Sequence, residues 1–563
     1  MKNKLSLKQL TNWVVLFFFL LFLAIPLIKI GLTAFPFAQG GDFAQFSQIF
    51  NQKWQTAFSN SLWYAVLAAS ISTILAFLLA YGNNFTKIGQ PFLMINSSIL
   101  QFPMLLPTIT YGFVLIYAFG KQGLWSKLFQ HQLFNIYGSI GILMGFIIYT
   151  LPPIFILINN AMKYLDARLF LVSRLMGDSP ARTLKKTIFE PLYRVLAVAF
   201  LQGFFMAFTD FGVPSAVGGQ TPFITTLLYE GFMGTIPDFQ YGAMIAITML
   251  LPSIISIIVL NHLQKKIVRY EKPQRVVLKT NKLRDWGFRL LFLTTSGFLL
   301  CIFLILVVIP FTTEWPYRIQ PTLVHLTRFL EDDSLRLTLR NSLTMAVSTA
   351  VIGTVLAYFA AILTSRERKT GRLHNIIDSI STVTNSIPGM VLGVAFLLLF
   401  GGSILHNTLA ILIISTVVHY FATPYQLAKE ALQKMNLNWE NTAKLMGDRW
   451  IDTIRRILIP NSKLTILEMF GYYFFNAMIT ISAVIFLTSA NTMVITAKLK
   501  ELQHFGRFND IFMLSLFLLM INLIMQGIIQ LLKRSLTNHE QKTSFRLSLL
   551  HLVRPLLRRL QQR

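Results

Sequence analysis

Apolar runs of about twenty residues recur along the whole chain, and no other feature limits the fold as strongly. About twenty apolar residues are needed for one helix to cross the hydrocarbon core of a bilayer. Of 563 residues, 54% are hydrophobic and only 13% are charged, whereas a soluble domain carries about a quarter charged residues. We therefore expect an all-α polytopic membrane protein. A β-barrel is excluded, because its strands would alternate in hydrophobicity over stretches of roughly 10 residues.

The apolar runs predict twelve transmembrane helices, arranged as six plus six. The first run begins at Trp13 after Lys2, Lys4 and Lys8 and lacks a clear small-residue cleavage site, so we expect an uncleaved first helix. The predicted spans lie near residues 13–33, 62–82, 91–118, 138–160, 193–216, 241–262, 288–311, 341–363, 377–400, 407–427, 464–487 and 510–532.

The charge of the chain is strongly basic, with 50 Lys and Arg against 23 Asp and Glu and a formal net charge of +27. In a soluble protein this excess would suggest nucleic acid. With the N-terminus inside, 39 of the 50 basic residues lie in cytoplasmic segments and 10 lie outside. This is the positive-inside distribution, and it predicts cytoplasmic N- and C-termini in a bacterial cytoplasmic membrane. The expected charged partner is membrane lipid, not nucleic acid.

The two sets of six helices form a tandem repeat. Asn60-Ser61-Leu62 recurs as Asn341-Ser342-Leu343, at an offset of 281 in the numbering. Six helices return the chain to the same side of the membrane, so both halves should share one orientation, related by an axis along the membrane normal. Other landmarks keep the offset of 281, or offsets of 271 and 270 after a shorter loop: Pro107, Gly112 and Gly120 with Pro388, Gly393 and Gly401; Tyr149 and Pro153 with Tyr420 and Pro424; and Gly177 with Gly447.

Four segments follow from this repeat. Residues 1–262 are the first six-helix repeat and 263–287 are a basic cytoplasmic linker. Residues 288–533 are the second repeat and 534–563 are a basic cytoplasmic tail. The tail has leucines among arginines, as in a helix lying on a membrane surface. A solvated basic tail is an equal alternative.

Two polar loops, near residues 161–194 and 428–463, share the sequence Leu-Met-Gly-Asp at 175–178 and at 445–448. The second loop is predicted as a helix, a glycine break, another helix and a stop at Pro460, with Leu445 and Met446 among its apolar positions. Glycine allows a sharp turn at Gly447, and Asp448 is placed to cap the following helix. Both loops fall on the cytoplasmic side. Each is expected to hold a short helix at the membrane surface, unless these are amphipathic surface helices without a partner.

The loops resemble the cytoplasmic EAA loop of ABC importer permeases, the membrane subunits of binding-protein-dependent transport. The pattern of that family is Glu-Ala-Ala, three residues, Gly, nine residues, then Ile-x-Leu-Pro. The second loop matches at Gly447, Ile457 and Pro460, with Ile459 in place of Leu. Its triplet is Asn441-Thr442-Ala443, and Glu440 lies one residue early.

The first loop matches the same pattern at Gly177, and its Ile188 and Pro191 each lie one residue late. Its triplet, Leu171-Val172-Ser173, also departs from Glu-Ala-Ala. The resemblance covers nearly the whole chain and implies two tandem six-helix type I ABC importer permease repeats. It further implies that each loop forms a coupling helix seated in a groove of an ATPase subunit. The residues expected at or near these contacts are Gly177, Asp178, Ser179, Pro191, Gly447, Asp448, Arg449 and Pro460.

The energy source is expected to be a separate polypeptide. The chain has no G-x-x-x-x-G-K-[ST] phosphate loop, and Gly120-Lys121 is followed by Gln122. By the resemblance, two copies of an ABC ATPase bind ATP and Mg²⁺, and an extracytoplasmic binding protein delivers the solute. We expect no cofactor, catalytic residue or metal site in this chain. The single Cys301 excludes a disulfide framework and a cysteine-rich metal site.

A few residues in the predicted spans are candidates for lining the path of the solute. Asp210 lies in or at the outer end of the fifth span, where a carboxylate is costly unless it meets water or a partner. Thr480 occupies the matching place in the second half. His419 and Tyr420 lie near the middle of the tenth span, and Tyr149 matches Tyr420; satisfied packing is the alternative role. Two prolines, Pro107 and Pro388, should bend the third spans, beside the path or as ordinary helix bends.

The solute is not fixed by these motifs. Fused permeases of this size resemble the group that serves ferric iron, thiamine or 2-aminoethylphosphonate, and the stretch from Thr209 to Gly219 is similar to the iron and phosphonate members. We expect ferric iron, with phosphonate or another phosphorylated solute next. The alternatives from other classes are a secondary transporter of the major facilitator type and a membrane scaffold. The facilitator pattern with its Asp-Arg pair is missing where YGNNFTKIGQ stands, at residues 81–90.

Overall fold

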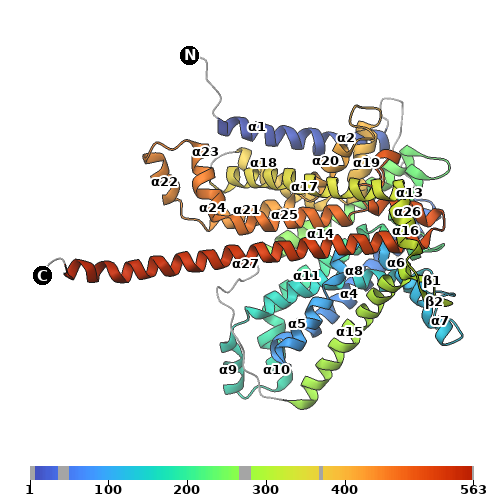
Figure 1. Ribbon diagram of the computed structural model, residues 1–563, viewed down its shortest axis with the longest axis horizontal. Coiled ribbons are helices and arrows are strands. Elements are labelled where there is room, and N and C mark those ends of the chain that lie inside the picture. The colour runs from blue at the N-terminus through green and yellow to red at the C-terminus, as the bar shows by residue number, and fades with distance from the viewer. Residues whose placement is uncertain (1–6, 36–49, 266–280, 367–371, 561–563) are drawn as a thin grey trace.

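Residues 7–35, 50–265, 281–366 and 372–560 are described by the computed structural model. Long helices of the two halves lie side by side in one bundle (Figure 1). The first half contains α1 Leu7–Phe19, α2 Ile25–Ala34, α4 Gln52–Phe85, α5 Gln90–Ile99, α6 Thr108–Phe119, α7 Leu124–Leu128, α8 Ser139–Lys163, α9 Ala167–Leu175, α10 Pro180–Leu184, α11 Glu190–Thr209, α12 Gly212–Val217, α13 Ile224–Met233 and α14 Phe239–Lys265.

The second half repeats this order. A small hairpin, β1 Thr312–Glu314 paired antiparallel with β2 Arg318–Pro321, departs from the all-α expectation. The helices are α15 Lys282–Val308, α16 Val324–Glu331, α17 Asp333–Ser365, α18 Arg372–Ser386, α19 Gly389–Phe400, α20 Leu409–His419, α21 Ala422–Gln433, α22 Asn438–Leu445, α23 Trp450–Thr453, α24 Ile459–Asn461, α25 Lys463–Ile479, α26 Ile495–His504 and α27 Phe508–Leu560.

The core of each half forms around its second span. In the first half α4 packs against α8 and α11, and in the second half α17 packs against α21 and α25. The buried face of α4 is rich in small residues, including Ala65, Ala69 and Ala76. Small side chains let helix backbones approach closely in a bilayer, where no hydrophobic force draws helices together. A buried hydrogen bond also crosses this contact, between the hydroxyls of Ser72 and Thr150 at 2.7 Å.

The first span of each repeat packs against the other repeat, as the ribbon shows for α1 beside α17 and for α15 beside α4 and α5 (Figure 1). Phe19 lies 4.5 Å from Phe421, measured between ring centroids. In the reverse direction, Phe288 of α15 lies 5.2 Å from Tyr81 of α4. The two halves are therefore interlocked, because each half buries part of its surface under the first span of the other.

The last span of the second repeat adds a further tie between the halves. Asn522 of α27 donates from its side-chain amide to the carbonyl of Leu105 at 2.8 Å. The hydroxyls of Thr110 and Ser515 lie 3.2 Å apart. Each such bond satisfies polar atoms that would be costly if left unpaired in hydrocarbon.

The predicted number of twelve spans is only partly supported. Among the described residues, eight helices are long and apolar enough to cross a membrane, or ten if each of two bent pairs is one span. The bends are 105° between α18 and α19 and 54° between α20 and α21. Of the other two predicted spans, residues 91–118 are divided into α5, a short 3₁₀ turn and α6, while residues 464–487 include the 17-residue α25 and irregular backbone.

The breaks before α6 and α19, and those after α11 and α25, occur at equivalent places in the two repeats, whereas the α20–α21 bend has no counterpart in the unbroken α8. Pro107 precedes α6 and Pro388 precedes α19, each as the N-cap residue in an extended conformation. A proline has no N–H for the preceding helix, so a new helix begins after it. The expected bends at Pro107 and Pro388 are thus complete breaks.

The repeats also share their hydrogen bonds. The hydroxyl of Ser61 accepts from the backbone N–H of Ile224 at 2.9 Å, and Ser342 accepts from Ile495 at 2.8 Å. These bonds hold α13 and α26 at equivalent positions, each after a stretch where the membrane helix has stopped.

Two of the predicted segment boundaries concern the linker between the repeats and the start of the tail. The linker 263–287 falls largely outside the described residues. The boundary expected between 533 and 534 lies inside α27, whose backbone remains helical to Leu560.

A close approach at Gly112 provides a test of this packing. A Cβ atom at Gly112 would lie 2.4 Å from the Cβ of Ala216 on α12. We expect Gly112→Ala to cost about 1–3 kcal/mol through overpacking, measured as a lower melting temperature in detergent. Gly287→Ala is the matched control, because no heavy atom lies within 4 Å of its added Cβ. Equal melting temperatures for the two variants would contradict the packing of α6 on α12.

Candidate coupling loops and interior polar cluster

The first Leu-Met-Gly-Asp loop joins α9 to α10 through a left-handed glycine. Gly177 has φ +71°, and the N–H of Asp178 donates to the carbonyl of Ser173 at 3.1 Å. The hydroxyl of Ser173 donates to the Asp178 carboxylate at 2.9 Å, and Arg182 lies 3.4 Å from the same carboxylate. Ser179 is the N-cap of α10 and accepts from the N–H of Arg182. The loop is thus fixed by its own side chains.

The second loop has the same backbone with different side-chain contacts. Gly447 has φ +85°, and the N–H of Asp448 donates to the carbonyl of Ala443 at 3.0 Å. The Asp448 carboxylate lies 3.3 Å from the guanidinium of Arg456. The N-cap of α23 is Arg449, without a side-chain cap. The expectation that Asp448 caps the next helix is therefore wrong, because its carboxylate pairs with a cation on the π-helical turn that follows α23.

The stop predicted at Pro460 lies next to a helix end, because α24 ends at Asn461 and α25 begins at Lys463, whereas Pro191 lies within a continuous run of helix. Pro191 lies in the first turn of α11, directly after a π-helical turn at Lys185–Phe189. Pro460 lies in α24, after a π-helical turn at Ile454–Leu458. A proline inside a helix removes one hydrogen bond of the regular ladder, and at Pro191 this loss lies next to the π-helical turn, where the ladder is already irregular. In the first repeat the loop helix therefore runs on into the membrane, from Pro180 to Thr209.

The tips of the two loops are exposed and apolar. Leu175 and Met176 are 78% and 74% exposed, and Leu445 and Met446 are 89% and 80% exposed. Exposed apolar groups that recur at one position are typical of a contact with another protein. Both loops lie at the same end of the bundle, near α10 and α22, opposite the end that holds the β1–β2 hairpin (Figure 1).

The four tip residues were not singled out as contacts from the sequence. Leu445 and Met446 were interpreted as members of an apolar helix face, because the letters alone do not say whether such a face is covered. Their recurrence at the same offset as Gly177 and Gly447 was the available signal.

In the interior, Asp210 acts as a helix cap. It ends α11, and its carboxylate accepts from the N–H of Val213 in α12 at 2.8 Å. Thr108 contributes a further hydrogen bond to this carboxylate. Thr480, its counterpart, ends α25 in the same way. The cap accounts for a buried carboxylate here, while a role in the pathway stays a prediction.

Tyrosines from both repeats gather beside this cap. Tyr149 lies close enough to interact electrostatically with Asp210, Tyr420 and Tyr472. The rings of Tyr420 and Tyr472 are 6.2 Å apart, and His419 lies 4.5 Å from Tyr420. The structure therefore brings together the predicted residues Asp210, Tyr149 and Tyr420 and adds Tyr472, which sequence reasoning missed. Among the described residues, no group of three or more His, Cys, Asp or Glu side chains is placed to hold a metal ion.

Two reciprocal contacts between the repeats involve α12, α13 and α26 and differ in chemistry. Lys500 and Gln503 of α26 both donate to the carbonyl of Ser215 on α12, each at 3.2 Å. In the other direction, Tyr229 of α13 packs its ring 6.0 Å from Phe486. Lys500 follows Tyr229 at the repeat offset of 271, so the repeats use a lysine and an aromatic ring at one position.

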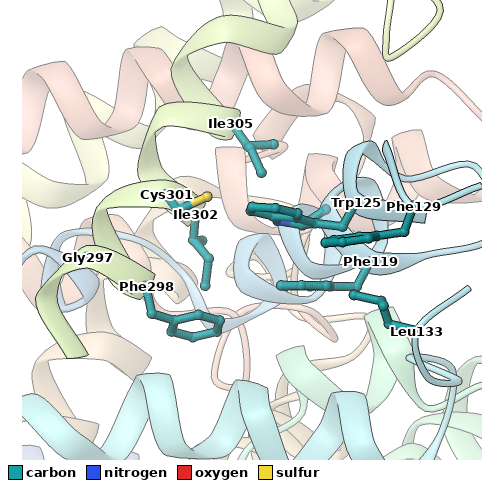
Figure 2. A pocket seen from close by; sticks show the side chains of 10 residues that line it. Phe119, Trp125, Phe129, Leu133, Gly297, Phe298, Cys301, Ile302 and Ile305 are labelled. Carbon is teal, nitrogen blue, oxygen red and sulfur yellow. The ribbon is translucent and has the colours of Figure 1, made fainter. Parts of the chain in front are cut away.

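A groove of about 410 Å³ lies away from this interior, between the α7 region and α15. Figure 2 shows Trp125 and Phe129 facing Cys301 and Ile305 across it. Its lining is almost entirely apolar, so it offers a polar solute no hydrogen-bonding partner. It is not part of the candidate site.

An ionic network ties the first residues of α17 to the first residues of α27. Arg507 lies 3.0 Å from the carboxylate of Asp332 and 2.5 Å from that of Asp510. Asp332 is also the N-cap of α17. Burial alone would raise the pKa of Asp332, but hydrogen bonds from Arg507 and from the N–H groups of Leu335 and Ser334, with the Arg507 charge, leave that pKa below its usual value.

The known proteins to which this chain is similar are membrane components of transport systems. The family model described as "binding-protein-dependent transport system inner membrane component" matches twice, at residues 72–269 and 353–538. A putative ferric transport system permease protein of Haemophilus influenzae is 25% identical over 87% of this chain and 79% of its own length. A ferric transport system permease protein of Actinobacillus pleuropneumoniae is 24% identical over 88% and 73%. A probable sulfate transport system permease protein of Chlorella vulgaris is 24% identical, over 36% and 76%.

The ionic network around Arg507 gives a pH-dependent test. A carboxylate whose folded pKa is lowered stabilises the fold above its unfolded pKa, and this contribution is lost as the pH falls through the folded pKa. Asp332→Asn keeps a good N-cap residue but loses the ion pair with Arg507. We expect a cost of about 1 kcal/mol at neutral pH, measured as a lower melting temperature that approaches the parent value in acid, below about pH 4.

Asp333→Asn is the control, because its side chain is 92% exposed. A melting-temperature difference for Asp332→Asn that stays constant down to pH 2 would contradict the ionic origin of the effect.

Proposed function

The chain belongs to the family of binding-protein-dependent transport system inner membrane components, and from this premise we propose that it carries ferric iron across a bacterial cytoplasmic membrane. The family supplies the membrane permease subunit of ABC transporters, which is not itself an enzyme and works with an ATPase and a solute-binding protein. Membership sets aside the secondary-transporter and scaffold alternatives. The observation that supports ATP-driven transport is the pair of matching loops, one per family match, with exposed apolar tips at one end of the bundle.

In the proposed mechanism, one ATPase copy sits on each loop, so that two copies bind one permease chain. The ATPases bind ATP and Mg²⁺, and this chain itself needs no cofactor. Closure of the ATPase pair moves both loops, and the interlocked halves then alternate between outward-open and inward-open states. The loops, the N-terminus and the C-terminus lie in the cytoplasm in this proposal. The binding protein delivers the solute at the opposite end, near the contacts of Lys500 and Tyr229.

Ferric iron is supported by the two relatives that align over most of this chain and are described as ferric transport permeases. An anionic solute, such as 2-aminoethylphosphonate or another phosphorylated compound, is the second candidate. It is favoured by Lys500, whose half-buried ammonium donates to the carbonyl of Ser215 and to the side-chain amide oxygen of Gln503. Thiamine has no specific observation in its favour.

The coupling role of the loop tips can be tested by changing them. We expect Leu445→Ser with Met446→Ser to weaken ATPase binding roughly tenfold or more. The reason is that each tip side chain would contribute about 1.5–3 kcal/mol when it becomes buried against the ATPase. The measurement is the amount of ATPase that co-purifies from detergent-solubilised membranes, with ATP hydrolysis assayed on the same sample.

Leu175→Ser with Met176→Ser should have a similar effect, and the two pairs combined should abolish co-purification. The control is Ile404→Ser, which changes a side chain that is 98% exposed away from both loops. Full recovery of the ATPase with all four tip residues changed would contradict the coupling role.

The solute can be decided by transport with matched variants. In proteoliposomes with the co-purified ATPase and binding protein, uptake of ferric iron, sulfate, 2-aminoethylphosphonate and thiamine is measured. If iron is the solute, Lys500→Met should leave uptake within about twofold, because a cation gains nothing from that ammonium.

If the solute is an anion, Lys500→Met should reduce uptake far more than Gln503→Met does. Gln503→Met removes the other donor to Ser215 without changing charge, so it separates an electrostatic role from a structural one. Uptake of phosphonate without uptake of iron would overturn the ferric proposal.

A further inference from the structure

The two loops rest on chemically different contacts at one equivalent place. In the first repeat, the rings of Phe85 and Phe170 lie 5.4 Å apart at an interplanar angle of 37°. In the second repeat, the guanidinium of Arg366 lies 2.9 Å from the carboxylate of Glu440. One pair is apolar and the other is ionic.

These pairs occupy the same positions of the tandem repeat. Arg366 follows Phe85 at the offset of 281, and Glu440 follows Phe170 at the offset of 270. The same two offsets relate Ser61 to Ser342 and Gly177 to Gly447. The correspondence therefore comes from the repeat itself and was not chosen to fit these contacts.

Each pair joins the cytoplasmic end of a membrane span to the helix that carries a loop tip. Phe85 is the last residue of α4, and Arg366 is the C-cap of α17. Phe170 lies on α9 and Glu440 lies on α22, the helices that precede Gly177 and Gly447. These spans are central, since α4 and α17 form the packing centre of their halves.

Burial makes both contacts stiff. Phe85 is buried, and the side chains of Arg366 and Glu440 are only 6% and 14% exposed. Arg366 also donates to the carbonyl of Met435 at 3.1 Å, which fixes it to the end of α21. Close-packed groups transmit displacement instead of absorbing it.

We propose that Phe85–Phe170 and Arg366–Glu440 are equivalent joints, whose residues position the loops and pass loop movement to α4 and α17. The inference rests on the proposed coupling function. The charges of Arg366 and Glu440 then neutralise each other. Glu440 contacts a residue of this chain instead of the ATPase. A buried ion pair can often be replaced by well-packed apolar residues, whereas removing one partner leaves an uncompensated buried charge. The first repeat already carries an apolar version of the joint.

The experiment copies the joint of one repeat into the other. The variants are Arg366→Phe, Glu440→Phe and the double variant with both changes, each purified as the full complex with its ATPase. For each complex, melting temperature, ATPase recovery, ATP hydrolysis and solute uptake are measured, and coupling is the uptake per ATP hydrolysed.

We expect each single variant to keep its ATPase but to lose coupling roughly tenfold. The double variant should recover coupling to within about twofold of the parent. The charge exchange Arg366→Glu with Glu440→Arg should recover it as well, because the ion pair is restored in reverse. Glu468→Phe is the control, since it breaks the exposed cytoplasmic pair with Lys533 and should leave coupling unchanged.

Three results would overturn the proposal that these contacts pass loop movement to the membrane spans. One is full coupling in both single variants. Another is a double variant that melts like the parent and keeps its ATPase but stays uncoupled. The third is loss of the ATPase from Glu440→Phe while Arg366→Phe retains it, because Glu440 would then be a direct ATPase contact.

A single variant that fails to fold does not remove the test. The milder Arg366→Lys and Glu440→Gln keep most of the volume, and the double and exchanged variants carry no unpaired charge. Failure of the joint also differs from failure of the proposed function, because in the latter case the parent chain would purify without any ATPase.

Discussion

Every backbone N–H and C=O inside a bilayer must find a partner within the protein, and the architecture depends on this constraint. Long helices such as α4 and α17 satisfy it internally. Where a helix stops at membrane depth, polar side chains form hydrogen bonds with the free backbone groups. The Asp210 carboxylate caps α12, and the hydroxyls of Ser61 and Ser342 accept the first N–H groups of α13 and α26. The irregular segments near the interior cluster exist only because these few polar side chains replace the missing helical bonds.

The exchange of first spans between repeats turns these local solutions into one mechanical unit. Because α1 packs on the second repeat, α2 packs between α14 of its own repeat and α19 of the other, and α15 packs on the first, one half cannot rotate without carrying a helix of the other. Buried polar bonds from α27 to the α5–α6 region strengthen this tie. Movement applied at either loop is therefore expected to reach both halves, and the route begins where the loop helix meets the second span.

Periodicity and spacing predicted the membrane class, the tandem repeat and the two glycine loops, because each of these is written in local sequence. At Pro107 and Pro388 the sequence predicted bends where the structure has complete breaks, and the interruption beyond Ile479 was not predicted, because hydropathy is high there. The sequence placed Leu445 and Met446 among the apolar positions of the second loop but did not indicate that they are exposed. Arg366 and Glu440 are far apart in the sequence, and only the repeat offsets, applied to both at once, connect them to Phe85 and Phe170.

In a single chain with two repeats, equivalent positions can carry different residues. Here these differences are confined to certain parts of the structure. In a symmetric homodimer the same side chain would appear at both copies of each position. Here the tips keep Leu and Met in both loops, as two copies of one ATPase would require. The joints differ, as Phe–Phe and Arg–Glu, and the reciprocal contacts between the repeats differ, as Tyr229 and Lys500. Asp210 in the interior of one half corresponds to Thr480 in the other. Likeness is therefore retained where two identical partners are proposed to bind, and it is lost where the halves support their own loops or face one solute that need not be symmetric.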